Sequence, residues 1–132
     1  MCYILYGAVD KSINSEEYSK AIDKSKYKFA LGTRHDVKMC IVNDSGSHRI
    51  TKWVCDCDFP TGKHNKDAKE IQEIASLIND LKIAKDAKYI YISLAWAGKK
   101  VSSERRLNIN GIDVAAFLAD MESDCLYRID FN

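Results

Sequence analysis

The sequence has little that would divide it into parts. It contains one proline in 132 residues, and it shows no internal repeat, no low-complexity tract and no linker rich in proline and serine. Nothing therefore marks a domain boundary. We expect residues 1–132 to form one domain, and a hydrophobic content of 46% is enough for a sizeable core.

Charge and hydropathy argue against two classes of partner. The formal net charge of +1 provides no general attraction for nucleic acid, so we expect no nucleic-acid partner. No apolar run approaches the roughly 20 residues that cross a bilayer, so we expect no membrane partner. Residues 2–9 are apolar, but they lack a basic leader and precede Asp10 and Lys11, which favours a strand over a signal peptide.

The cysteine content argues against a disulfide framework. The count of five is odd, no secretion signal precedes the cysteines, and four of them lie in strand-like runs. Reduced, mostly buried thiols in a cytoplasmic protein fit this pattern better than disulfides do. The five are Cys2, Cys40, Cys55, Cys57 and Cys125.

Hydrophobic periodicity predicts alternating strands and helices. The nearly continuous apolar runs at 2–9 and 88–97 are typical of strands covered on both faces. Spacings of three and four residues predict the helices. The predicted order is strand 2–9, helix 15–25, a β-hairpin of 36–43 with 48–58, helix 66–84, strand 88–97, helix 114–122 and strand 125–131.

This β-α-β-β-α-β order, followed by α-β, is the element order of a ferredoxin-like unit. It predicts an α+β fold with a single sheet of about five strands and two to three helices, packed mainly on one face. The alternative is a three-layer α/β fold, which would be favoured if 2–9 and 88–97 were parallel neighbours.

The predicted hairpin decides which side chains face the core. Apolar residues alternate with polar or small ones along 36–43, and Trp53, Cys55 and Cys57 alternate on the second arm. We therefore expect these three side chains to be buried and Asp56 to face solvent. After strand 88–97, the segment from Lys99 to Arg106 is expected to be a solvated polar loop. Asp67 and Glu70 predict a capping box at the start of the long helix.

Residues 55–64 contain the highest concentration of side chains that could bind a ligand or take part in catalysis. Cys55 and Cys57 form a C-x-C pair, whose sulfurs would lie on one face of a strand and could share a soft metal ion. Zinc usually takes four ligands, so His64 and His35 are the candidates to complete the site. The alternative is that both cysteines are core residues, because buried cysteine behaves as a small hydrophobe.

Residues 60–66 lead from this pair into the long helix and predict an anion seat. The first N–H groups of a helix lack partners and carry a positive potential. The segment is not a Walker A motif, because the position five before Gly62 is Cys57 rather than glycine. The candidate anion-binding residues are Thr61, Gly62, Lys63, His64 and Lys66.

No complete catalytic set accompanies these candidates. The chain has no nucleophile elbow and no H-E-x-x-H motif, and His35 and Asp36 would point to opposite faces of a strand. The sequence therefore favours a non-catalytic ligand-binding or interaction module, with a small anionic ligand or a protein as its partner. A zinc-binding domain and a thiol-dependent enzyme that uses Cys55 or Cys57 are the two alternatives.

Overall fold

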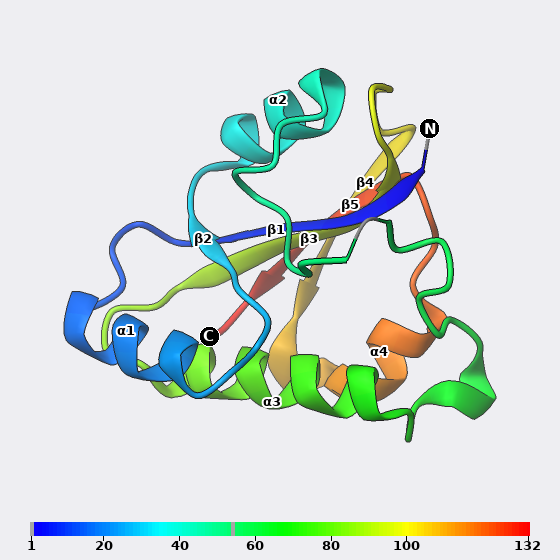
Figure 1. Cartoon of the computed structure of the whole chain (residues 1–132). Helices are drawn as coiled ribbons and strands as arrows, with labels where there is room; N and C mark the ends of the chain where they lie inside the picture. The colour runs from blue at the N-terminus through cyan, green and yellow to red at the C-terminus, as the bar shows by residue number, and fades with distance from the viewer. Residues whose placement is uncertain (1, 54) are drawn as a thin grey trace.

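A computed structural model describes residues 2–53 and 55–132, with the backbone alone for Lys63. The described residues form one sheet of five strands, which are β1 (Tyr3–Val9), β2 (Ala30–Leu31), β3 (Tyr89–Trp96), β4 (Ser103–Asn108) and β5 (Cys125–Asp130). Their order in the sheet is β2-β1-β3-β5-β4 (Figure 1). β3 pairs antiparallel with β1 and β5, whereas β2 and the edge strand β4 pair parallel with β1 and β5.

Helices cover both faces of this sheet. The helices α1 (Ser15–Asp23), α3 (Lys69–Ile83) and α4 (Val114–Asp120) lie on one face, and α2 (Arg34–Asn43) lies on the other (Figure 1). The 3₁₀ turns η1 (Lys63–Asn65) and η2 (Ile109–Gly111) precede α3 and α4. The α+β class is confirmed, although the described residues form four α-helices rather than two to three. None of these helices has the length and apolar character needed to span a bilayer.

β1 and β3 form the centre of the sheet and are buried on both faces. Leu5 and Val9 belong to the large core under α1 and α3, whereas Ile4, Tyr6 and Ala8 belong to a second core under α2. This double burial explains why both segments are nearly continuous apolar runs. Because β1 and β3 are antiparallel, the condition that would have favoured a three-layer α/β fold is not met.

The predicted hairpin is wrong, because its first arm is the helix α2. The Thr33 hydroxyl accepts a hydrogen bond from the Asp36 amide at 3.2 Å, and the Asp36 carboxylate accepts one from the Thr33 amide at 2.9 Å. This capping box starts a helix where the alternating pattern indicated a strand. Met39, which a strand would have turned inward, is 42% exposed. The buried side chains follow helical spacing and are Val37, Cys40 and Ile41.

The predicted facing of the second arm is also wrong. The described part of residues 48–58 forms no strand, and a single β-bridge joins Arg49 to Tyr6. Trp53 is 40% exposed and Cys57 is exposed, whereas Asp56 is 1% exposed. Which side chains of this segment are buried depends on its hydrogen bonds to β1 rather than on the alternation of apolar residues.

Two smaller expectations differ from the structure. Residues 103–106, expected within a polar loop, belong to the edge strand β4, whose charged side chains are typical of an edge protected from pairing with another sheet. α3 begins at Lys69, after Ala68, and no side chain caps it. The capping box expected from Asp67 and Glu70 is therefore not formed.

Ile74, at the centre of α3, is fully buried in the large core. We expect Ile74→Ala to lower the free energy of unfolding by about 2–5 kcal/mol, because it removes buried methyl groups and leaves a cavity. Ile83→Ala is the matched control in the same helix, since Ile83 is 77% exposed, and it should change stability by less than about 0.5 kcal/mol. Denaturant unfolding measures both values. A loss below about 1 kcal/mol for Ile74→Ala would contradict this packing of α3.

Candidate metal site

The candidate site lies where residues 48–53 and 55–57 run along an open edge of β1. β2 pairs only with Ala8 and Val9, so the first half of β1 has no strand on that side among the described residues. Cys55 and Cys57 come at the end of the segment that fills this edge. Three backbone hydrogen bonds hold the segment there: from the Gly7 amide to the His48 carbonyl at 2.9 Å, from Ile50 to Leu5 at 2.9 Å and from Asp56 to Tyr3 at 2.8 Å.

Asp56 anchors the end of this segment. Its carboxylate accepts hydrogen bonds from the Leu5 amide at 2.8 Å and from the Thr51 hydroxyl at 2.6 Å. A buried carboxylate needs such partners, because an unpaired charge in the interior is costly. Asp56 is turned inward, whereas Cys55 beside it is half-buried against the second core and Cys57 is exposed.

Cys55 and Cys57 meet a third cysteine there, from the start of the chain. The Sγ atoms of Cys2, Cys55 and Cys57 all lie within 4.8 Å of one another. The Cys2 carbonyl accepts a hydrogen bond from the Ala97 amide at 3.0 Å, which fixes Cys2 beside the end of β3. Cys2 and Cys55 are half-buried and Cys57 is exposed, so the cluster is open to solvent on one side.

The thiols of this cluster differ in how readily they ionise. The pKa of Cys55 is lowered, first by a hydrogen bond from the Cys57 backbone amide and then by the thiols of Cys57 and Cys2. The pKa of Cys2 is raised, first by its hydrogen bond with Cys55 and then by burial. Cys55 therefore forms a thiolate at a lower pH than Cys2 does. A thiolate is the form that binds metal or attacks an electrophile.

The structure brings together the predicted pair, Cys55 and Cys57, but not the predicted histidines. His35 is exposed in the first turn of α2, and His64 is exposed in η1. Neither belongs to the group, and Cys2 takes the place expected for a histidine. Sequence reasoning missed Cys2 because the hairpin assignment gave residues 48–58 a different neighbour.

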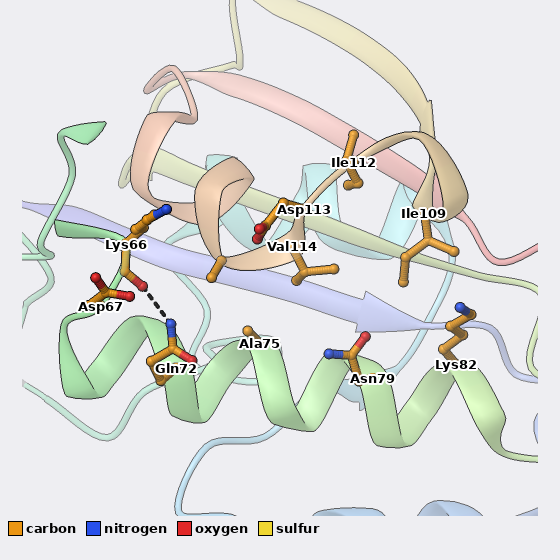
Figure 2. A pocket seen from close by; sticks show the side chains of 11 residues that line it. Lys66, Asp67, Gln72, Ala75, Asn79, Lys82, Ile109, Ile112, Asp113 and Val114 are labelled. Carbon is orange, nitrogen blue, oxygen red and sulfur yellow. Dashed lines mark hydrogen bonds between the residues drawn. The ribbon is translucent and has the colours of Figure 1, made fainter. Parts of the chain in front are cut away.

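The corner formed by residues 57–66 is bound to α4 and α3. The Gly62 amide donates to the Ala119 carbonyl, and Gly62 has a φ of +118°, which favours glycine. The Lys66 carbonyl accepts a hydrogen bond from the Gln72 side chain at 2.7 Å (Figure 2). The long helix begins at Lys69 rather than at 66, so η1 separates most of the corner from the first helical amides.

Three of the residues proposed for the anion seat have exposed side chains. Thr61, His64 and Lys66 are exposed, and the Lys63 side chain lies outside the described residues. Lys66 is at one end of a groove of about 510 Å³ between α3 and α4 (Figure 2). No contact among the described residues tests whether an anion binds here, and the anion seat stays a prediction.

Comparisons with protein families, with curated proteins and with solved structures found no match for this chain. The chemistry of its own residues is therefore the basis for assigning a function. Among the described residues, the cysteine cluster is the one group of three or more histidine, cysteine or acidic side chains whose ligand atoms lie close enough to share an ion.

The lowered pKa of Cys55 predicts a difference in reactivity within the cluster. In metal-free buffer, the alkylation rate of Cys55 should rise at a lower pH than that of Cys2, because Cys55 ionises first. Iodoacetamide labelling across a pH series, resolved by mass spectrometry of the peptides, measures both rates. In denaturant the two profiles should merge. Identical profiles in the folded protein would contradict the described hydrogen bonding.

The burial of Asp56 predicts a selective effect on stability. Asp56→Ala leaves the Leu5 amide without its partner and should lower the free energy of unfolding by about 1–3 kcal/mol. Asp58→Ala is the matched control, because Asp58 is exposed and lies two residues away. Denaturant unfolding of the two variants compares them. Equal losses would show that Asp56 does not anchor the segment.

Proposed function

We propose that this chain is a non-catalytic metal-binding domain that holds a zinc ion through the thiolates of Cys2, Cys55 and Cys57. The observation that carries the proposal is the convergence of three sulfur atoms within 4.8 Å, from two segments far apart in the sequence. Thiolates select soft or borderline ions, and zinc is the commonest of these in sulfur sites.

The geometry is close to what zinc requires. Zinc–sulfur bonds of about 2.3 Å in a tetrahedron put the sulfurs about 3.8 Å apart. Sulfurs already within 4.8 Å of one another need to approach by about 1 Å or less. Rotation of the cysteine side chains supplies such a shift without a change in the backbone.

Three thiolates leave one position of a tetrahedral zinc ion open. The exposed side of the cluster, at Cys57, gives that position access to water or to a donor from another molecule. A protein partner that supplies the fourth ligand fits this arrangement. A reducing, cytoplasmic location also fits it, because the three thiols have to stay reduced in order to bind the ion.

Bound zinc would act on the fold as well. Cys2 is fixed beside β3, and Cys55 and Cys57 end the segment along β1, so an ion between them ties the start of the chain to that segment. An ion that binds the native state alone stabilises it, by about 2.7 kcal/mol when the free ion is at 100 times its dissociation constant.

A thiol-dependent activity of Cys55 is the second candidate function. The lowered pKa of Cys55 favours it, because a lower pKa raises the fraction of thiolate, which is the nucleophilic form of cysteine. The two candidates are separable, since zinc bound to the cluster protects Cys55 from alkylation, whereas a nucleophile that works without metal stays reactive when zinc is added.

The test of the proposal is a titration of the reduced, metal-free protein with cobalt(II) and then with zinc. We expect one equivalent of cobalt to give thiolate-to-metal absorption, which zinc displaces. Cys57→Ser should weaken zinc binding by more than the roughly 10–100-fold typical of losing an outer-shell partner, because it removes a direct ligand. Proton release should accompany binding, since the thiols must ionise.

The matched control is Cys125→Ala, which removes a buried thiol of β5 in the large core. It should bind zinc with the affinity of the native protein. Substoichiometric cobalt binding by the native protein, or equal affinities for Cys57→Ser and Cys125→Ala, would overturn the metal site.

A further inference from the structure

A second feature of the α2 face is a small groove between the start of α2 and the strands β4 and β5. It encloses about 260 Å³. Its walls carry guanidinium groups and its floor is apolar, with Leu126 and the ring of Tyr91 both largely buried. The principal lining residues are Arg34, Tyr91, Glu104, Arg106, Leu126 and Arg128.

One wall of the groove is a cluster around Glu104. Arg34 binds this carboxylate through two nitrogens, at 2.6 and 2.7 Å, and Lys38 binds it at 3.2 Å. These bonds, first of all those from Arg34, lower the pKa of Glu104 to about 2. The carboxylate is therefore ionised at every physiological pH, yet it neutralises only one of its two cations.

A second cluster, around Asp130, repeats this imbalance with two arginines that line the groove. Arg106 binds one oxygen of this carboxylate at 2.6 Å, and Arg128 binds the other at 2.9 Å. The two clusters together hold four cations and two carboxylates. The groove region thus carries two positive charges in excess, whereas the whole chain has a formal net charge of +1.

Arg128 is fixed before any ligand arrives. Its guanidinium stacks over the Tyr89 ring at 4.1 Å from the centroid, and it donates to the Tyr91 hydroxyl at 3.3 Å. A guanidinium held by an aromatic face and two hydrogen-bonding partners loses little freedom on binding. This preorganisation favours a ligand with several acceptor oxygens.

We infer that this groove binds the phosphate group of a small phosphomonoester. A phosphate dianion matches the two excess charges, and its oxygens accept the paired N–H groups of arginine. The apolar floor at Tyr91 and Leu126 receives the organic part of the ester. A volume of about 260 Å³ lies just below the usual range for small-molecule pockets, so the ligand is a small ester.

β4 supplies a matched pair of variants for the test. Arg106 lines the groove and its side chain is 70% exposed, so Arg106→Gln should fold normally. Arg105 is its neighbour and borders the groove, but its guanidinium binds Glu122 at 3.1 Å, on the other face of the sheet. Arg105→Gln therefore removes the same charge without removing a groove donor.

The probes are phenyl phosphate, inorganic phosphate and phenyl sulfate, titrated at constant ionic strength into metal-free protein. The NMR chemical shifts of the backbone amides, followed through each titration, give the affinity and show which residues lie near the bound ligand. We expect phenyl phosphate to shift β4, β5 and the first turn of α2, and to bind more tightly than either other probe. Arg106→Gln should weaken it roughly tenfold, and Arg105→Gln should leave it nearly unchanged. Added salt should weaken binding.

Several outcomes would overturn the inference. Equal affinities for the two variants would show that overall charge, and not the groove, attracts the ligand. Shifts confined to residues 61–66 would place the anion at the helix-start corner instead. Equal binding of inorganic phosphate would remove the role of the apolar floor. A single-stranded oligonucleotide that bound these strands more tightly than phenyl phosphate would assign the groove to nucleic acid.

Discussion

The fit of residues 48–53 and 55–57 along the open edge of β1 is the constraint on which the candidate metal site depends. β2 is two residues long and leaves most of this edge without a partner strand. An exposed edge of a central, apolar strand would be a site of aggregation, so a segment that covers it has a structural purpose of its own. The close approach needs Gly7, because a Cβ atom there would lie 2.7 Å from both Ile50 and Phe29.

The same constraint explains why one carboxylate is buried and two thiols are not. The edge of β1 offers the Leu5 amide as a donor, and Asp56 has the side chain that can accept from it. With Asp56 turned inward, Cys55 is half-buried and Cys57 is exposed, and both lie near Cys2 at the start of β1. The candidate metal ligands Cys55 and Cys57 are thus positioned by a polar residue that would not itself touch the ion.

α2 separates the two proposed binding regions. At its C-terminal end, the Ile41 carbonyl accepts a hydrogen bond from the Gly98 amide, and the adjacent Ala97 amide binds the Cys2 carbonyl. At its N-terminal end, Arg34 reaches across the sheet to Glu104 of the edge strand. The thiols of the candidate metal site and the guanidiniums of the proposed phosphate groove therefore lie at opposite ends of one helix, and their different chemistry would select different ligands.

The strongest sequence patterns predicted the fold class and most of the central elements, because double burial and helical periodicity leave clear signals in β1, β3 and α3. The pattern failed at α2, where Val37 and Ile41 fit both a strand and a helix. The capping residues Thr33 and Asp36 are the local signal that distinguishes the two. The hydrophobic pattern also failed to predict β4, because a charged edge strand has no alternation of apolar residues.

The candidate site could be predicted only in part, for a physical reason. A C-x-C pair is local and visible in the sequence, but its third ligand is brought in by hydrogen bonds between segments about fifty residues apart. Such irregular segments open more readily than regular strands, because few ladder bonds hold them. An ion bound by Cys2, Cys55 and Cys57 would suppress this local unfolding. The metal would therefore stabilise the segment that is held by the fewest backbone hydrogen bonds.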